Sequence, residues 1–181
     1  MQLFIWIAAL YIFGKLEEVP VFGAQGTASS ADTMSGKLGV DFVKQISEYV
    51  ANKGGFDRVL KMVKITGGGD GRAFGEFTVQ KEHLNHQGIL HGGLTGTIVD
   101  NISTYAMMSR GSHPGVTANL NVSYLSVAKL GEIVEIDART VRAGRKMAYL
   151  DIVLKRQSDK SIIATGRQVK YIDFDKVKLN Y

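Results

Sequence analysis

The sequence predicts one α+β domain, in which helices and antiparallel strands occupy separate stretches of the chain. Apolar residues recur at helical spacing in residues 35–55 and again in 90–108. The last third of the chain instead alternates apolar and polar residues in extended runs that are joined by short turns. With 181 residues, of which 45% are hydrophobic, the chain can bury an ordinary core. Helices segregated from antiparallel strands are typical of α+β folds.

The first two predicted elements are an amphipathic helix and a β-hairpin. Residues 35–55 carry apolar side chains at helical spacing and end on two adjacent glycines (Val40, Val43, Ile46, Val50; Gly54, Gly55). Residues 58–80 alternate on both sides of the sequence GGGDG, which predicts a hairpin. A phosphate-binding glycine loop needs a helix directly after it, and here a strand is expected, so we interpret GGGDG as a turn.

A buried helix and four strands follow. Residues 90–108 repeat apolar side chains at helical spacing over about 28 Å. The strands are expected as an antiparallel meander at residues 116–128, 132–144, 146–157 and 161–174. We therefore divide the chain into a segment outside the fold (1–35), a folded domain (36–176) and a tail (177–181).

The N-terminal segment opens on an 11-residue apolar run, LFIWIAALYIF at residues 3–13. A membrane-spanning helix needs about 20 such residues, and no lysine or arginine precedes the run as in a signal peptide. Small residues at 23–36 then predict a flexible linker, and Met34 could start a shorter form. The role of the segment as a signal, an anchor or an alternative start stays open.

The stretch NHQGILHGGLTGTIVDN, residues 85–101, combines helix-disfavouring glycines with a carboxylate on an apolar face. Glycine costs roughly 1 kcal/mol in a helix interior, but in the first turn it lets another group approach the free backbone N–H groups. An oxyanion is such a group, and close helix–sheet packing is the structural alternative. Asp100 lies eight residues after Gly92, ~12 Å along the axis, so one chain cannot bring both to the same carbonyl. Either neighbours satisfy Asp100, or a second subunit supplies it.

The net charge and the absence of cysteine limit the kinds of chemistry that the chain can carry out. The net charge of +5 is carried entirely by residues 111–181, which indicates an anionic partner there or a solvated basic surface. The chain has no cysteine, which excludes disulfides, thiolate metal sites and a cysteine nucleophile. No ligand spacing supports a metal site, and we expect no cofactor and no nucleic acid partner.

The sequences HLNHQGILHGGLTGTIVDNIS, PGVTANLNVSYLSVAKLGE and GRQVKY strongly resemble the hotdog-fold acyl-CoA thioesterases. The resemblance covers roughly residues 40–172. It implies a hotdog fold, in which an antiparallel sheet wraps around a long central helix. It also implies a homodimer formed edge to edge, often paired into a homotetramer, and a fatty acyl-CoA substrate. A lipid-transfer protein is a further possible partner.

The resemblance also assigns catalytic roles to individual residues. Asp100 would act as general base toward a water, Gly92 would donate its N–H to the thioester carbonyl, and Asn85 would assist. Thr117 stands where family members carry a serine that orients the water, so the hydroxyl is kept and a methyl is added. His91 matches a family histidine whose role is more often positional than catalytic. The other histidines, His83, His86 and His113, are expected at the surface or in loops rather than as ligands.

Two segments and one tyrosine would contact coenzyme A by the same resemblance. They are residues 124–129, residues 142–147 and Tyr171 (Tyr124, Leu125, Ser126, Val127, Ala128 and Lys129; Arg142, Ala143, Gly144, Arg145, Lys146 and Met147). The basic side chains of the second segment suit phosphate recognition. The alternative is that this segment is only a polar hairpin tip.

The resulting prediction is an enzyme that hydrolyses medium- or long-chain fatty acyl-CoA to free fatty acid and CoA. The alternatives are a non-catalytic acyl-CoA-binding regulatory protein and a hotdog enoyl-CoA hydratase. The sequons at Asn101 and Asn121 fall within a predicted helix and strand, where a glycan cannot be buried. Together with the lack of cysteine and the expected substrate, they favour a cytoplasmic or mitochondrial location.

Overall fold

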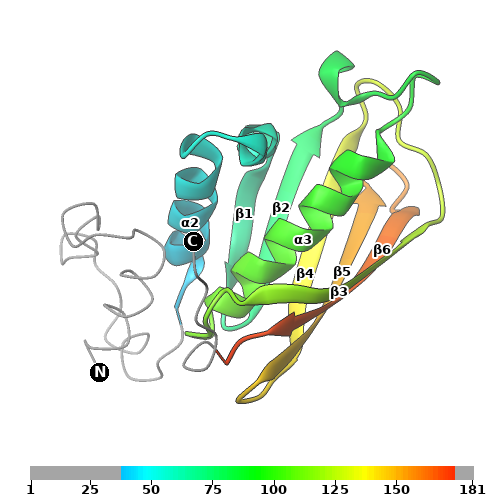
Figure 1. Cartoon of the computed structure of the whole chain (residues 1–181). Coiled ribbons are helices and arrows are strands. Elements are labelled where there is room, and N and C mark those ends of the chain that lie inside the picture. The colour runs from blue at the N-terminus through cyan, green and yellow to red at the C-terminus, as the bar shows by residue number, and fades with distance from the viewer. Residues whose placement is uncertain (1–37, 174–181) are drawn as a thin grey trace.

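The computed structural model describes residues 38–173, which form one antiparallel sheet with a long helix across one face (Figure 1). This helix is α3 (Gly92–Met108), and a shorter helix, α2 (Val40–Asn52), packs beside the first strand. The α+β class is therefore confirmed, as are both predicted helices. The predicted N-terminal segment 1–35 and the tail 177–181 lie outside the described residues. In the described range, no helix is both long and apolar enough to cross a membrane.

Six strands form the sheet in the order β1-β2-β4-β5-β6-β3, and every neighbouring pair is antiparallel. Their bounds are β1 Lys64–Gly69, β2 Arg72–Thr78, β3 Val116–Tyr124, β4 Ile133–Ala143, β5 Met147–Arg156 and β6 Ile162–Tyr171. Two short 3₁₀ helices, η2 (Phe56–Met62) and η3 (Lys81–His83), lie before β1 and after β2. The turn between β1 and β2 is the GGGDG segment, whose last four residues all have positive φ.

The predicted four-strand meander is wrong in one respect. Strands β4, β5 and β6 are consecutive neighbours, but β3 pairs with β6 at the far edge of the sheet. The cause lies at Gly115, which has a φ of +64° and packs so tightly on the Tyr171 carbonyl that a Cβ would collide with it. This contact sets the start of β3 against the end of β6. The other edge of the meander, on β4, is already occupied by β2.

The predicted hairpin also starts later than expected. Residues before Lys64 form η2 instead of the first half of a strand. Phe56, Val59 and Met62 recur at every third residue, which is the period of a 3₁₀ helix and places them along one edge. Gly55, at a φ of +65°, turns the chain into this helix.

The core lies between α3 and the sheet. Ile98, Val99 and Ile102 of α3 are fully buried, and burial of such a side chain contributes about 1.5–3 kcal/mol. Gly166 of β6 allows the closest approach, because a Cβ there would overlap the side chains of Val99 and Ile152. This packing brings the residues after Gly166 directly under the middle of α3.

Candidate active site

Asp100 lies in the middle of α3, on the side that faces β6 and β3, and its side chain is 42% exposed. The hydroxyl of Thr117 donates to Asp100 Oδ1 at 2.9 Å. Nε2 of Gln168 also donates to this oxygen and, at 2.8 Å, to Thr117 Oγ1. The structure therefore brings Asp100 and Thr117 together, as the resemblance implied, around a glutamine that the sequence did not single out.

Lys170 completes this cluster from β6. Its side chain is only 6% exposed, and its ammonium lies 3.9 Å from Asp100 Oδ1. The ammonium donates to Thr104 Oγ1 at 2.9 Å and to Thr117 Oγ1 at 3.4 Å. Burial lowers the pKa of Lys170 below its ordinary value of 10.5, and the negative charge of Asp100 opposes that shift.

Sequence reasoning assigned no role to Gln168 or Lys170, although a signal was present. Alternate residues of β6 point toward α3, and the buried positions before these two are the small residues Ala164 and Gly166. A polar glutamine and a lysine at the next two inward positions break the expected apolar pattern. Such a break within a predicted strand indicates a buried polar site.

The N-terminal turn of α3 forms the second group. His91 is the N-cap, and its Nδ1 accepts the Gly93 N–H at 2.9 Å. The carbonyl of Gly92 accepts the Tyr124 hydroxyl at 2.9 Å. Within residues 38–173, no group accepts a hydrogen bond from the N–H of Gly92, so this donor is open to a ligand. These contacts support a positional role for His91.

Asn85 lies next to this turn, in a tight loop closed by pairing of Leu84 with Leu90. Its Oδ1 accepts the backbone N–H groups of Gln87 at 2.9 Å and Ile89 at 3.3 Å. The amide oxygen is thus held by the backbone, and Nδ2 is the group left to donate elsewhere.

The two groups are separated within one chain. Gly92 and Asp100 stand ~12 Å apart along α3. Their strand contacts, Tyr124 and Thr117, lie seven residues apart on β3, which corresponds to roughly 23 Å. The structure therefore gathers the predicted catalytic residues into two half-sites at different points of α3, with Asn85, His91 and Gly92 in one and Asp100 and Thr117 in the other.

The two predicted CoA segments are separated in the same way. Residues 142–147 form the β4–β5 turn, and Met147 pairs with Tyr171, which also pairs with Val116 at the start of β3. Residues 124–129 follow the other end of β3 and contact the Asn85 loop through the Lys129–Ile89 bridge. Ala128 is buried there, whereas Arg142, Arg145 and Lys146 are exposed.

A cleft that the sequence did not reveal lies beside the N-terminus of α3. Its volume is about 600 Å³, which is in the range of small-molecule sites. One wall is the exposed edge of η2, and most of the lining surface is apolar (Phe56, Val59, Met62, Leu84 and Leu94, with His91, Arg58 and Lys61 among the polar groups). The 3₁₀ period of Phe56, Val59 and Met62 was the available sequence signal.

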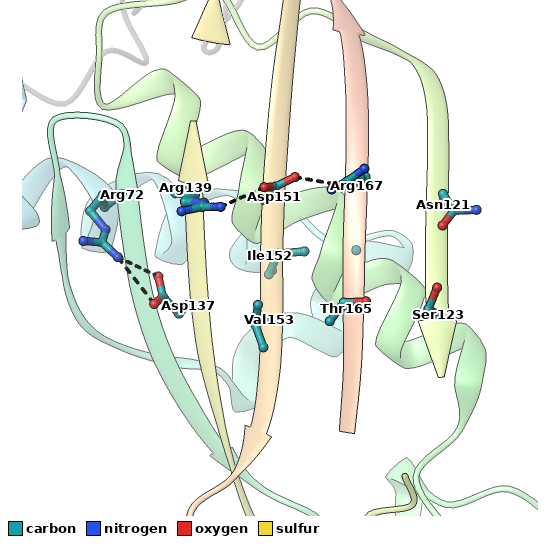
Figure 2. A pocket seen from close by; sticks show the side chains of 11 residues that line it. Arg72, Asn121, Ser123, Asp137, Arg139, Asp151, Ile152, Val153, Thr165 and Arg167 are labelled. Atoms are coloured by element: carbon teal, nitrogen blue, oxygen red, sulfur yellow. Dashed lines mark hydrogen bonds and ion pairs between the residues drawn. The ribbon is translucent and has the colours of Figure 1, made fainter. Parts of the chain in front are cut away.

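A second hollow, of about 540 Å³, lies on the sheet face opposite α3 (Figure 2). Here Arg72 pairs with Asp137 at 3.3 Å. Asp151 pairs with both Arg139 at 3.1 Å and Arg167 at 3.6 Å, as the dashed lines in Figure 2 show. None of the predicted catalytic residues lines this hollow, so it is separate from both half-sites.

The remaining histidines have separate surroundings, and His83 is one of the residues that line the cleft beside α3. The expectation of a surface or loop position is wrong for His83, which is 7% exposed, packs edge-on against Phe77 and accepts the Gln80 N–H. His86 is exposed, and His113 is half-buried in a loop. Among residues 38–173, no cluster of three or more histidine or acidic side chains is arranged to hold a metal ion.

Comparison with known proteins identifies the family. Residues 87–163 match the model of the thioesterase superfamily, and this range includes Gly92 and Asp100 of α3. The chain is 36% identical over 132 residues to acyl-coenzyme A thioesterase 13 of Homo sapiens. The matched residues make up 72% of this chain and 94% of that protein. The crystal structure of zebra fish thioesterase superfamily member 2 superposes with a TM-score of 0.72 at 39% identity, covering 75% of this chain and 99% of that one.

A bacterial structure is also similar. It is a hypothetical thioesterase protein with coenzyme A from Streptococcus pneumoniae, with a TM-score of 0.58 at 26% identity, covering 61% of this chain and 84% of that one. The chain therefore belongs to the thioesterase superfamily. It has the hotdog fold that its sequence predicts, and it is an enzyme of the thioester hydrolase class.

Proposed function

We propose that this protein hydrolyses medium- or long-chain fatty acyl-CoA to the free fatty acid and CoA. The observation that carries the proposal is the pair of half-sites, one with an open N–H at Gly92 and one with a carboxylate at Asp100. The human relative is named an acyl-coenzyme A thioesterase, and the streptococcal structure contains coenzyme A, which supports the same substrate class.

In the proposed reaction, the thioester carbonyl accepts hydrogen bonds from the Gly92 N–H and Asn85 Nδ2. Asp100 takes a proton as a water oxygen attacks the carbonyl carbon, and the oxyanion that forms lies at the positive end of the α3 dipole. The C–S bond then breaks, and the CoA sulfur leaves as a thiolate. The proton held by Asp100 returns to that sulfur, which leaves a fatty acid and CoA.

The half-sites must come from two chains, because within one chain they are too far apart. β3 is one of the two edge strands of the described sheet, and eight of its nine residues are exposed, including Val116, Leu120 and Tyr124. Such a long, partly apolar edge favours pairing with another strand. Antiparallel pairing of β3 with its copy, centred on Leu120 and Asn121, sets the Thr117 end of one strand opposite the Tyr124 end of the other. This homodimer joins Asp100 of one chain to Gly92 of its partner.

The same dimer unites the CoA segments. The end of β3 that carries Thr117 is the end at which residues 142–147 and Tyr171 lie. The opposite end leads into residues 124–129. Arg142, Arg145 and Lys146 would then bind the CoA phosphates at the rim of a site whose other wall belongs to the partner. We expect the KM for acyl-CoA to rise with salt, and the Arg145→Ala/Lys146→Ala variant to raise it further.

The cleft beside α3 is the proposed binding site for the acyl chain. It opens next to His91 and Gly93, adjacent to the Gly92 N–H, and its apolar wall suits a hydrocarbon tail. A Val59→Trp substitution would fill the cleft. This variant should therefore lose activity on long acyl chains before it loses activity on short ones.

The charged hollow of Figure 2 is the proposed contact between two dimers in a homotetramer. Its arginines and aspartates alternate in sign across the strands, so a second copy can meet it with opposite charges. Asp151→Arg reverses the charge of the side chain that pairs with both Arg139 and Arg167. This variant should form dimers instead of tetramers, as measured by light scattering. An unchanged mass would place the contact elsewhere.

For location, we propose the cytoplasm or the mitochondrion. Asn101 is half-buried within α3, where a glycan acquired in the secretory lumen could not be accommodated. Fractionation of cells that express the C-terminally tagged protein tests this. A glycosidase-sensitive shift in mass would overturn it.

The experiment for the function is thiol release from a panel of acyl-CoAs that differ in chain length. We expect turnover with medium and long chains, and a kcat at least ~10²-fold lower for Asp100→Asn. If the wild type binds acyl-CoA but releases no thiol, the protein is a binding protein. Hydration of an enoyl-CoA without thiol release would instead indicate a hydratase.

A further inference from the structure

The two carboxylate oxygens of Asp100 have different surroundings. Oδ1 accepts the Thr117 hydroxyl and the Gln168 amide, and it faces the Lys170 ammonium at 3.9 Å. Within residues 38–173, no side chain donates to Oδ2. One oxygen therefore accepts two hydrogen bonds and faces the charge of a third group, and the other is available to a substrate or water.

The orientation of the Gln168 amide follows from its neighbours. An amide oxygen placed against a carboxylate would be repelled, so Nε2 must face Asp100 and Oε1 must face the opposite way. Ser103 lies there, with its Oγ 2.5 Å from Gln168 Oε1 and 2.7 Å from the Val99 carbonyl. Ser103 has a single hydroxyl proton, which it can donate either to the Val99 carbonyl or to Gln168 Oε1. Donation to Gln168 Oε1 holds the amide in the orientation that turns Nε2 toward Asp100.

The Thr117 hydroxyl is fully occupied. Its proton goes to Asp100 Oδ1, and its oxygen accepts from Gln168 at 2.8 Å and from Lys170 at 3.4 Å. A hydroxyl has one proton and two lone pairs, so Thr117 has no further capacity to bind a water. In this arrangement Thr117 holds the carboxylate and does not hold the water.

We propose that Gln168 and Lys170 are positioning residues, which fix Oδ1 of Asp100 through Thr117 so that Oδ2 is the oxygen that takes the proton from water. This inference rests on the proposed thioester hydrolysis and adds two residues to its site. It also assigns the water-facing role to one oxygen of one carboxylate.

The buried Lys170 lowers the stability of the fold, which supports a functional reason for its presence. Its ammonium is almost completely buried, and the carboxylate that faces it is partly in water and at 3.9 Å, beyond hydrogen-bonding distance. A buried cation with an imperfect partner is destabilising relative to an apolar side chain of similar size. Burial lowers the pKa of the His113 imidazole, and the nearby positive charge of Lys170 lowers it further.

The test compares Gln168→Met, Lys170→Met and Lys170→Arg with the wild type in the full-length protein. Thiol release from an acyl-CoA gives kcat and KM, and thermal unfolding gives Tm. We expect Gln168→Met and Lys170→Met to lower kcat about 10- to 100-fold, because a small misplacement of a catalytic group has effects of this size. KM should change less than about twofold, since neither residue contacts the substrate.

Two further readouts distinguish positioning from a structural role. Lys170→Met should keep or raise Tm, because it removes the buried charge, and Lys170→Arg should recover part of kcat. The matched control is Lys155→Met on β5, which points to the opposite face of the sheet and should retain wild-type kcat.

The outcomes separate the two proposals. If the wild type releases thiol and the Gln168→Met and Lys170→Met variants keep its kcat, the positioning role is overturned and the function stands. A fall in Tm with unchanged kcat per folded molecule overturns it equally. Equal kcat for Lys170→Arg and Lys170→Met would exclude the charge as the cause. A wild type that releases no thiol from any acyl-CoA overturns the function and the positioning role together.

Discussion

The two half-sites on α3 differ in how completely their polar groups are satisfied. At the first turn, His91 occupies one backbone donor, and the Gly92 N–H faces no acceptor in the described chain. At Asp100, eight residues later, two side chains donate to a single carboxylate oxygen, and the Lys170 ammonium lies 3.9 Å from it. The first half-site is prepared for a group that arrives with the substrate. The second has been built to hold one of its own residues still.

This difference follows from the backbone at each place. A helix start leaves N–H groups without partners, and glycine keeps them accessible, so the N-terminal half-site needs few side chains. A carboxylate inside a helix has no such backbone support. It must be held by residues from other strands, and here these are Thr117 of β3 and Gln168 and Lys170 of β6.

Removal of the carboxylate should have the largest effect. Asp100→Asn keeps the size and shape of the side chain, but its amide cannot take a proton from water. We expect kcat to fall at least ~10²-fold with little change in KM, as measured by thiol release. A variant with unchanged kcat would remove Asp100 from the mechanism.

Loss of the Asn85 amide should have the next largest effect. Asn85→Ala removes Nδ2 as a donor to the carbonyl but leaves the Gly92 N–H, so kcat should fall about 10- to 100-fold, less than for Asp100→Asn. Asn85→Asp provides the control, because its carboxylate can keep the loop contacts to Gln87 and Ile89 but cannot donate. If both variants are as active as the wild type, Gly92 acts alone.

A smaller effect is expected at His91, whose ring caps α3. His91→Ala should destabilise the protein by about 1 kcal/mol in denaturant unfolding, because the Gly93 N–H loses its acceptor. His91→Asn can accept the same hydrogen bond and should recover most of the stability. Activity should change only a few-fold in both. A large loss of kcat in His91→Asn at wild-type stability would indicate a chemical role for the imidazole.

The smallest expected effect is on the pH dependence of stability near Lys170. Burial lowers the pKa of Lys170 in the folded state below 10.5, so the folded protein binds fewer protons than the unfolded chain in the interval between the two values. Stability should therefore rise with pH across that interval, since the penalty of the buried charge is complete only below the folded-state pKa. Unfolding of wild type and Lys170→Met between neutral pH and pH 10 measures this. Parallel curves for the two proteins would contradict it.

Much of the fold followed from the sequence because its signals are local. The 3.6-residue period of α3, the GGGDG turn and the tight turn at Gly144 each occur where the structure has them. The partner of β3 did not follow, because it is set by contact between Gly115 and Tyr171, which lie 56 residues apart. Strand order depends on such long-range packing, and the spacing of apolar residues does not encode it.

The candidate site divides along the same line. Asp100, Gly92 and Asn85 lie in one continuous stretch and were predicted, by resemblance, together with Thr117. Gln168 and Lys170 are distant in sequence and reach Asp100 only because Gly166 lets β6 approach α3 closely. The separation of the half-sites could be predicted from helix geometry alone, since eight residues span ~12 Å. The residues that hold the carboxylate required the three-dimensional structure.

Subunit complementation tests the central claim, that each site takes Gly92 from one chain and Asp100 from the other. Asn85→Ala and Asp100→Asn, which are expected to retain at most about a tenth of the wild-type activity, are mixed one to one under conditions in which subunits exchange. Half of the dimers are then mixed, each with one intact and one doubly altered site, so activity should rise to about a quarter of the wild-type value. Mass spectrometry of differently tagged chains confirms the mixed dimers. Mixed dimers that form and show no more activity than the parent variants would contradict the composite site.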